Sequence, residues 1–381
     1  MAPQPFYTDR GTPIAVLHCA QALVQLGYQV DVATFPVGTD PDFNGITCFR
    51  SANPFGFRYV PIGFSLRKLI LDGPLIATTT RLLRRHKYSF IHAVEEAAFP
   101  AVLLGARFGV PVIYDMQSSL PQQMAASSVF GWRPIQVLLE ACERWVVRKC
   151  QAVACSAGLA GRVQRIAPDA RVLEWNFPSP VSAHTHGDVS GLRASLGIRE
   201  DAPVVMYAGT FEPYQGLLTL VQAMPFVQTD LPGAVLVLVG ANGARRDLGI
   251  PAGATLSGGL RVVPRQPREN MGRFLSMADV LVSPRLYGDN VPLKVFDYLA
   301  AGRPIVATDI PPHRAVLDES TSLLVGPEAS DMGRAISRVL RDRDLAARLS
   351  ESAKGQAAET VTWLSFVDRV DRLARLVVEP A

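Results

Sequence analysis

The sequence has few of the features that mark secreted, disulfide-bonded or membrane-spanning proteins. Its five cysteines are an odd number at irregular spacings, which disfavours a disulfide framework, and none forms the CxxC pair of a structural zinc site. The longest apolar region is interrupted by Arg107, well short of the ~20 residues of a membrane span. The opening MAPQPFYTDRG lacks the apolar core of a signal peptide. We therefore expect a cytoplasmic protein in a reducing compartment.

Charge and metal-ligand motifs are also sparse. The 38 Lys and Arg against 34 Asp and Glu give a net charge of +4, too small to demand a nucleic-acid partner. No His-Glu-x-x-His motif is present. The Asp-Xaa-Asp patterns at 40–42 and 342–344 fall in a turn and in a charged helix, where we interpret both as structural. We expect no nucleic-acid partner, no cofactor and no essential metal.

Short β-rich runs alternate with helical runs along most of the chain. Before residue 178 the candidate strands are QVDVATF, GITCFRS, FIHAVEE, PVIYDMQ, QAVACSA and RVLEWNF; after residue 192 they are PVVMYAGTF, AVLVLVGAN, ADVLVSPR, RPIVATDI and TSLLVGP. Such alternation predicts α/β folding with parallel sheets covered on both faces. Two sets predict two doubly wound, Rossmann-like domains, residues 1–178 and 192–360, joined by the linker PSPVSAHTHGDVSG.

The two ends of the chain depart from this pattern. A doubly wound domain usually opens with a buried strand before its glycine-rich turn, but only MAPQPFY precedes TDRGTP, and its prolines are poor strand residues. We hypothesise that the central first strand is truncated, or that translation starts upstream. The last segment, 361–381, carries an apolar stripe at helical spacing that must dock on another surface, and the first domain is one candidate.

Residues 287–309, YGDNVPLKVFDYLAAGRPIVATD, combine a helix start with groups suited to an anion. Asn290 is a good N-cap, Pro292 suits the first turn, and Gly302 fits the position after the helix. A helix that starts near residue 291 offers free N–H groups and the positive end of its dipole. Lys294 adds a cation beside them.

Two carboxylates, Asp289 and Asp297, lie on either side of this helix start. Eight residues of helix span roughly 12 Å, so the two acids could bind the hydroxyls at both ends of an elongated ligand with an anionic middle, such as a sugar nucleotide. The alternative is structural: Asp289 only caps the helix, and Asp297 is only a solvated helix residue.

These motifs resemble the signature of the retaining, family-4-type glycosyltransferases (glycosyl transferases group 1). In that signature two glutamates separated by seven residues precede an apolar helix, a Gly-Xaa-Pro turn and a strand. Four further segments are similar to family segments in the same order: RGTPIAVLHCAQALVQLGYQVDVAT, IHAVEEAAFPA, VVMYAGTFEPYQGLLTLVQAM and ADVLVSPR. The resemblance covers most of the chain. It implies the GT-B fold, a nucleotide-sugar donor, and a glycan or lipid-linked acceptor in cell-envelope or exopolysaccharide assembly.

The resemblance also implies roles for individual residues. Asp289 would contact the donor sugar and Asp297 the ribose, backbone N–H groups around Leu293 and Lys294 would hold the diphosphate, and the turn at 11–12 would close over it. The implied donor-binding residues are Gly11, Thr12, Gly209, Thr210, Gln215, Arg285, Asn290, Val291, Pro292, Leu293 and Asp297. The implied catalytic residues are Asp289, Lys294, His92 and Gln117.

The sequence departs from the family pattern in its acids and its cations. Both signature glutamates are aspartates. Thr210 and Gln215 stand where many relatives have an Arg and a Lys that bind phosphates. We predict that Lys294 and Arg285 supply the missing charge to the leaving diphosphate. The alternative for Arg285 is a surface arginine in a salt bridge.

A third departure concerns the histidine that relatives often have near the reacting sugar. Gln117 stands at that position, and Gln can hydrogen-bond a hydroxyl but cannot act as a base. His92 and Asp115 are nearby alternatives, although His92 could also be a strand-end histidine satisfied by backbone. The mechanism that the family implies is front-face attack, in which the leaving phosphate accepts the acceptor's proton. It needs positioning and charge stabilisation but no protein nucleophile.

Residues 57–87 form a basic amphipathic stretch with seven Lys or Arg against one Asp. Such a stretch can make peripheral contact with an anionic membrane, which would place the protein at the membrane's inner face. The alternative is an ordinary helix whose apolar face covers the core.

Three other functions stay open. They are a sugar-nucleotide epimerase of the GT-B fold, a catalytically weak GT-B binding subunit, and a nicotinamide dehydrogenase, for which RGTP lacks the full GxGxxG fingerprint.

Overall fold

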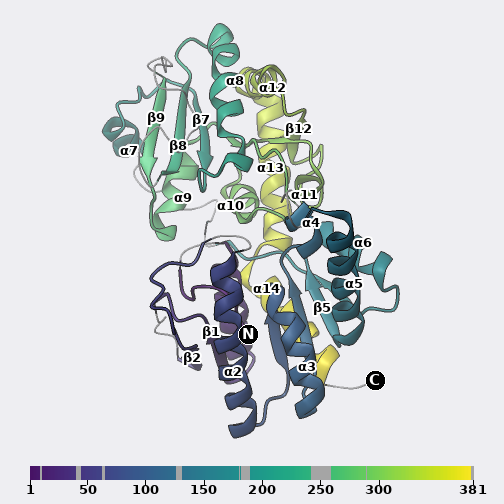
Figure 1. The fold of residues 1–381 in the computed structure, drawn as a ribbon. Helices are drawn as coiled ribbons and strands as arrows, with labels where there is room; N and C mark the ends of the chain where they lie inside the picture. The colour runs from purple at the N-terminus through teal and green to yellow at the C-terminus, as the bar shows by residue number, and fades with distance from the viewer. Residues whose placement is uncertain are drawn as a thin grey trace. The chain divides into compact units, whose positions relative to one another are not determined.

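A computed structural model describes residues 1–8, 11–39, 44–61, 65–125, 131–179, 181, 189–241, 259–288 and 290–378. The chain divides into two compact units (Figure 1). Unit 1 comprises Met1–Phe177 and Trp363–Ala381, and unit 2 comprises Pro178–Thr362. All strand pairs in the sheets of the described ranges are parallel, which confirms the predicted α/β class. Within these ranges, no helix has both the length and the apolar character needed to cross a membrane.

Unit 1 contains two parallel sheets. One pairs β1 (Val30–Thr34) with β2 (Ile46–Arg50). The other has the order β3-β4-β5-β6, with bounds Ile91–Val94, Val112–Met116, Ala152–Cys155 and Val172–Glu174. Every residue of β4 and β5 is buried, as expected for parallel strands that are covered on both faces.

The position between these two sheets holds only the first residues of the chain. The Ala2 N–H donates to the Ala33 carbonyl (2.9 Å), and the Val94 N–H donates to the Met1 carbonyl (3.0 Å). Met1 and Ala2 therefore bridge β1 and β3, but they form an isolated bridge and not a strand. An isolated bridge therefore stands where a doubly wound domain usually has its first strand.

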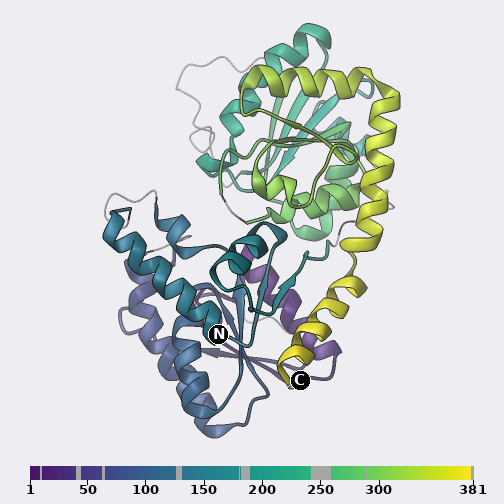
Figure 2. The same ribbon diagram turned by 90° about the vertical axis from the view of Figure 1, so that its right-hand side faces the viewer.

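The helices of unit 1 cover both faces of its sheets, and Figure 2 shows α2, α3 and α5 along one side and α1 with α14 along the other. Their bounds are α1 Gly11–Gln25, α2 Leu66–Arg85, α3 Ala98–Phe108, α4 Leu120–Ala125, α5 Arg133–Lys149, α6 Ala157–Ile166 and α14 Trp363–Val378, with a 3₁₀ turn η1 at Glu95–Ala97. Helix α14 packs against α1, and the Trp363 indole donates to Gln25 (2.7 Å). The predicted closing helix thus belongs to unit 1.

Unit 2 contains one six-stranded parallel sheet in the order β12-β11-β10-β7-β8-β9. Its bounds are β7 Val204–Ala208, β8 Val235–Ala241, β9 Leu260–Pro264, β10 Val280–Ser283, β11 Ile305–Thr308 and β12 Ser322–Val325. In chain order this is 3-2-1-4-5-6, so the winding reverses between β7 and β10. Ligands of doubly wound sheets bind outside the carboxyl ends of the strands at such a reversal.

Strand β9 is absent from the strands that the sequence predicts. This strand lies at the edge of the sheet and alternates buried with exposed residues: Val263 is buried, and Val262 and Pro264 are exposed. It therefore lacks the continuous apolar run that identified the central strands.

Helices flank this sheet, and α8 packs closely on α12 (Figure 1). The bounds are α7 Val189–Ser195, α8 Leu217–Asp230, α9 Arg268–Met277, α10 Leu293–Ala301, α11 Pro311–Arg314, α12 Ala329–Arg341 and α13 Arg343–Thr360, with a 3₁₀ turn η2 at Pro213–Gln215. Residues 180 and 182–188 of the predicted linker lie outside the described residues.

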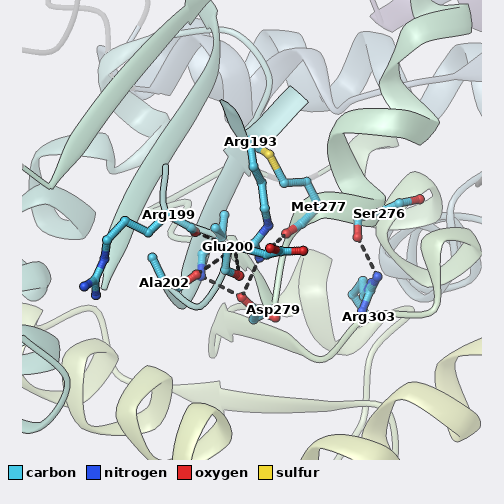
Figure 3. Close-up of polar contacts among 9 residues, drawn as sticks. Arg193, Arg199, Glu200, Ala202, Ser276, Met277, Asp279 and Arg303 are labelled. Atoms are coloured by element: carbon cyan, nitrogen blue, oxygen red, sulfur yellow. Dashed lines mark hydrogen bonds and ion pairs between the residues drawn. The ribbon is translucent and has the colours of Figure 1, made fainter. Parts of the chain in front are cut away.

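A half-buried arginine joins the amino ends of the two central strands of unit 2 (Figure 3). The Arg193 guanidinium, from α7, donates to the carbonyls of Ala202 (2.9 Å) and Met277 (3.2 Å) and pairs with the Asp279 carboxylate (3.3 Å). Asp279 in turn accepts from the Val204 N–H (2.7 Å). These contacts fix the start of β7 relative to the start of β10, and so the distance between their carboxyl ends.

Candidate functional site

The predicted donor-binding residues of unit 2 gather where its sheet changes direction. Gly209 and Thr210 directly follow β7, Arg285 follows β10, and α10 begins at Leu293. Three segments that are far apart in sequence therefore contribute to the edge of the sheet formed by the carboxyl ends of β7 and β10. Asp289, predicted to contact the donor sugar, lies outside the described residues.

Lys294 lies at the centre of this group. Its Nζ donates to the Tyr207 hydroxyl and to Gln215 Oε1, both at 2.7 Å, and lies 3.9 Å from the centre of the Tyr207 ring. Within the part of the chain that the structure describes, no carboxylate forms an ion pair with it. Burial, and secondly the charge of Arg285, hold the pKa of Lys294 well below its usual value. A desolvated amine next to another cation favours the binding of an anion.

Two glycines allow the loop after β7 to approach Lys294 and β10. Gly209 has φ +150°, and a Cβ there would lie 2.9 Å from both Lys294 Nζ and the Tyr207 hydroxyl. Gly216 has φ +71°, and a Cβ there would lie 2.0 Å from the Pro284 carbonyl oxygen. A side chain at either position would push the loop away from the site.

Arg285 is buried and holds the loop that leads into α10. Its guanidinium donates to the Tyr287 carbonyl (2.9 Å), the Asn290 carbonyl (3.1 Å) and Asn290 Oδ1 (2.8 Å). It also lies over the Tyr214 ring, 5.3 Å from its centre. Arg285 is therefore a buried residue that orders this loop and brings a second positive charge to the site, and not a surface arginine.

The start of α10 differs from the prediction. The helix begins at Leu293 and its N-cap is Pro292, not Asn290, because the Asn290 side chain is bonded to Arg285. Pro292 and Val291 are buried beneath the helix start. Gly302 ends the helix with φ +60°, as predicted. The Val295 N–H donates to the Pro292 carbonyl (2.9 Å), so the N–H groups of Leu293 and Lys294 precede the hydrogen bonds of the helix. Such N–H groups at a helix start can bind an anion, and the anion site at this end stays a prediction.

The second signature acid, Asp297, is bonded within unit 2. Its Oδ1 accepts a hydrogen bond from the Ser179 hydroxyl (2.6 Å) and lies 3.6 Å from an Arg268 guanidinium nitrogen. Burial raises the pKa of Asp297, while Arg268 and the Ser179 hydroxyl act against this shift. Asp297 is thus not the freely solvated helix residue of the structural alternative.

A neighbouring tyrosine connects α10 to the sheet. The Tyr298 hydroxyl accepts from the Ala208 N–H at 2.9 Å and lies 3.4 Å from the carbonyls of Ala208 and Val282. Because those residues end β7 and come from β10, Tyr298 fixes the helix against the two strands whose carboxyl ends form the site.

A second group of candidates lies in unit 1: His92 is in β3, Asp115 is in β4, and Gln117 directly follows β4. His92 Nε2 lies 3.1 Å from Asp115 Oδ2, and Gln117 donates to Asp115 Oδ1 at 2.6 Å. His92 Nδ1 lies 3.8 Å from the Cys19 sulfur. The structure therefore brings His92, Asp115 and Gln117 together. Burial would lower the pKa of His92, but Cys19 and Asp115 outweigh it and raise the pKa.

Glu95 extends this unit 1 group beyond the predicted residues. It follows β3 with a left-handed φ of +49° and lies 3.4 Å from the Ser118 hydroxyl. Burial, and then repulsion from Glu96, raise the pKa of Glu95 to about 7. Gly11 and Thr12 also belong to unit 1, where they begin α1, and their contact with a diphosphate stays a prediction.

Several residues that hold the unit 2 site together were not predicted: Tyr207, Tyr298, Arg268 and Ser179. A tyrosine within the apolar run VVMYA needs a partner for its hydroxyl when buried, so Tyr207 could have been suspected. Ser179 is separated from Asp297 by 118 residues, and no local pattern joins the two.

Two family models match this chain, one in each unit. The family model described as "Glycosyl transferases group 1" matches residues 189–356, and the one described as "Glycosyl transferase 4-like domain" matches residues 10–174. These ranges cover most of each unit and include all the site residues described above except Ser179.

Two curated relatives and one solved structure are similar over much of the chain. A D-inositol 3-phosphate glycosyltransferase of Mycobacteroides abscessus is 27% identical over 386 residues, covering 94% of this chain and 82% of the relative. The enzyme of that name from Nocardia farcinica is 28% identical over 265 residues, covering 66% of this chain and 58% of the relative. The structure of Anabaena Alr3699/HepE in complex with UDP-glucose superposes with a TM-score of 0.70 at 15% identity, covering 97% of each chain.

The two family models account for both units, and the structural similarity shows the fold that the sequence signature implies. The chain belongs to the group 1, family-4-type glycosyltransferases and has their GT-B fold.

Proposed function

We propose that this glycosyltransferase is a retaining enzyme that moves a hexose from a nucleoside diphosphate sugar to a hydroxyl of a glycan or lipid-linked acceptor, in cell-envelope or exopolysaccharide assembly. The observation that carries the proposal is the position of Lys294. Its ammonium group reaches from α10 to the loop after β7 and contacts Gln215, one of the two positions where relatives have phosphate-binding cations.

The diphosphate of the donor would bind at the start of α10. The free N–H groups of the helix and its dipole favour an anion there. The protonated Lys294 and the Arg285 guanidinium would supply positive charge. Both would stabilise the negative charge that develops on the leaving diphosphate. Because these side chains supply the positive charge, we propose that transfer needs no essential metal.

The two signature acids would bind the ends of the donor. Asp297 would accept a hydrogen bond from a ribose hydroxyl in addition to the one from Ser179, since a carboxylate has capacity for several. Asp289 would bind hydroxyls of the transferred sugar. The aspartate in place of glutamate requires the ligand to lie closer to the backbone of this segment.

The reaction proposed is front-face attack by an acceptor hydroxyl, with its proton passing to the leaving phosphate. No protein nucleophile takes part. The group of His92, Asp115 and Gln117 offers polar atoms that would orient sugar or acceptor hydroxyls. With a raised pKa and a carboxylate partner, His92 would act as a hydrogen-bond donor and not as a base.

The similar proteins guide the choice of substrates. Two relatives are named D-inositol 3-phosphate glycosyltransferases, and the similar Anabaena structure contains UDP-glucose. We therefore propose UDP-hexoses as the first donors to test, and phosphorylated polyols along with lipid-linked sugars as the first acceptors.

Peripheral membrane contact through residues 57–87 is also part of the proposal. The structure changes the set of residues available for it: Lys68 is buried and pairs with Glu96 (3.2 Å), and Leu71, Leu75, Leu82 and Leu83 face the core. Six of the seven cations of this stretch stay exposed, namely Arg58, Arg67, Arg81, Arg84, Arg85 and Lys87.

The proposed function is tested by a thermal-shift panel of UDP, GDP and ADP sugars with and without EDTA, followed by determination of the product anomer by NMR. We expect one donor class to raise the midpoint irrespective of EDTA, and the product to keep the donor's anomeric configuration. Lys294→Ala should remove the shift, whereas Lys354→Ala, an exposed lysine of α13, should keep it. An inverted product, or no stabilisation by any nucleotide, would contradict the proposal.

A further inference from the structure

A buried histidine lies at the carboxyl ends of β10 and β11 in unit 2. His313, in the short helix α11, is fully buried. Its Nδ1 lies 2.7 Å from the Thr308 carbonyl oxygen, at the end of β11, and its Nε2 lies 2.9 Å from the Ser283 hydroxyl, at the end of β10. One imidazole ring therefore joins the ends of two neighbouring strands.

The two distances show how the ring is used. A carbonyl oxygen can only accept a hydrogen bond, so Nδ1 donates to Thr308, and in the neutral ring Nε2 accepts from the Ser283 hydroxyl. Burial lowers the pKa of His313 to about 4, and the bond to Thr308 acts against this shift. The charges of Arg285 and Lys294 also lower the pKa. His313 is therefore uncharged near neutral pH, with a partner for each ring nitrogen.

Thr308 carries this connection on to Arg285. The register of β10 with β11 ends at the pair of Ser283 and Ala307, so Arg285 lies beyond the paired strands. The hydroxyl of Thr308, which is itself fully buried, donates to the Arg285 carbonyl. The backbone of Arg285 is thus held against the end of β11, although the strand pairing has already ended.

The position of the Arg285 backbone determines where its guanidinium can act. The guanidinium orders the loop that leads into α10 by donating to Tyr287 and Asn290. Helix α10 carries Lys294, the second cation of the site. His313 is therefore connected, through this backbone, to the arrangement of both cations.

This polar group contrasts with the strands that carry it. The residues just before it in β10 and β11 are apolar and fully buried: Leu281, Val282, Ile305, Val306 and Ala307. A buried polar group costs free energy unless each member is hydrogen-bonded, whereas apolar side chains have only to fill the space. A fully bonded polar group fixes the geometry of its members. The carboxyl ends of β10 and β11 are therefore held by directed hydrogen bonds as well as by packing.

We propose that His313 is a positioning residue for the donor diphosphate: by fixing Thr308, it fixes the Arg285 backbone and so the direction of the arginine charge. The inference rests on the proposed function, in which Arg285 stabilises the leaving diphosphate. It goes further, since it assigns a role to a residue that acts on the diphosphate through two others. The role requires a hydrogen-bond donor at Nδ1 and an acceptor at Nε2, and not a charge.

The test is the affinity of the full-length protein for UDP, measured by isothermal titration calorimetry at neutral pH. His313→Leu removes the donor and the acceptor, and should weaken binding by about tenfold, because a displaced charge interacts less well with the diphosphate. His313→Gln keeps a donor and an acceptor and should restore most of the affinity. Thr308→Val keeps the size of the side chain but removes the hydroxyl, and should weaken binding as His313→Leu does.

A double-mutant cycle separates positioning from damage to the fold. In the Arg285→Met background, His313→Leu should cause little further loss of affinity, because the charge that it positions is absent. Damage to the fold would instead give the same loss with and without Arg285. Val227→Ala, in the core of unit 2, is the control: it should lower the urea midpoint but keep the affinity for UDP.

Two results would overturn the inference alone. One is equal UDP affinity of the wild type, His313→Leu and Thr308→Val. The other is an undiminished effect of His313→Leu in the Arg285→Met background. Absence of UDP binding by the wild type is a different result, which would overturn the proposed function and, with it, this inference.

Discussion

Burial and a nearby cation both lower the pKa of Lys294. The hydrogen-bond partners of its side chain among the described residues are neutral groups. The Nζ atom donates to the Tyr207 hydroxyl and Gln215, and both interactions persist when the amine is neutral. Burial and Arg285 lower its pKa, whereas a bound diphosphate would favour the charged form. Diphosphate binding should therefore be coupled to the uptake of a proton by Lys294.

The first prediction concerns this coupling. The affinity of the wild type for UDP should be highest at a pH below the pKa of Lys294 in the free protein. It should fall as the pH rises through that pKa, because binding must then be accompanied by the uptake of a proton from solvent. Lys294→Arg keeps its charge and should bind with an affinity that varies little with pH. Lys294→Ala should bind at least about tenfold more weakly. Isothermal titration calorimetry in buffers of different ionisation enthalpy measures both affinity and proton uptake; a pH-independent wild type would contradict the coupling.

His92 gives a second prediction at the scale of one residue. Burial opposes the charge of His92, but Cys19 and Asp115 raise its pKa to about 10 in the folded protein. A group whose pKa is raised on folding stabilises the native state fully below its unfolded value of about 6.5, and this stabilisation is lost as the pH rises through the folded value.

The stability difference between the wild type and His92→Gln should therefore be largest near pH 6 and shrink toward pH 10. Urea unfolding at several pH values measures it. His86→Gln removes an exposed histidine of the same unit and controls for the loss of an imidazole. A difference that grows with pH would show that His92 is neutral when folded.

At the scale of elements, α10 shows what the sequence can and cannot predict. The apolar spacing, Lys294 and Gly302 predict a helix with an anion site at its start, and the structure has this helix. The predicted start near residue 291 is two residues before the observed one, because the local sequence alone favours Asn290 as the N-cap. Its side chain is instead bonded to Arg285, a contact that depends on how the loop folds back.

The connection of α10 to the sheet provides the third prediction. Tyr298→Phe removes the acceptor of the buried Ala208 N–H and should cost about 1–3 kcal/mol, since an unpaired buried donor carries its full desolvation penalty. The same change should raise the KM for the donor, because the helix start is no longer fixed against β7. Chemical denaturation and steady-state kinetics measure the two effects; unchanged stability would mean that water replaces the hydroxyl.

Other elements show why periodicity has limits. It identifies residues that share a helix face but not which face is buried, and in α5 the buried face holds Glu143 because Arg162 and Ser119 satisfy it. The edge strand β9 was missed because its half-exposed residues lack a continuous apolar run. Central strands such as β7 are buried along their whole length, and their continuous apolar runs predict them correctly.

At the scale of the whole molecule, the last helix completes the core of the first unit. Phe366 of α14 is fully buried and its ring contacts those of Trp175, Phe177 and Trp363. The apolar stripe predicts a helix that must dock, and two of the aromatic residues that it contacts, Trp175 and Phe177, belong to the segment before the linker. The sequence could predict the need for a partner surface but not its identity.

The fourth prediction follows from this packing. Phe366→Ala should destabilise unit 1 by about 3–5 kcal/mol, because a large buried ring leaves a cavity that neighbouring rings cannot fill. Urea unfolding monitored by tryptophan emission reports on unit 1 through Trp175. Leu364→Ala, on the exposed side of the same helix, should change stability by less than about 0.5 kcal/mol. Equal effects of the two would show that α14 packs loosely.

The path of the chain between the two units has a consequence for synthesis. The chain leaves unit 1 after Phe177 and returns to it at Trp363, so unit 2 is one continuous segment and unit 1 is interrupted. Chains emerge from the ribosome from the N-terminus, and domains generally fold as units. All of unit 2 has been made before α14 exists, so the unit that is begun second can be finished first. Until α14 emerges, the newly made α1 and the aromatic pair Trp175 and Phe177 lack their partner.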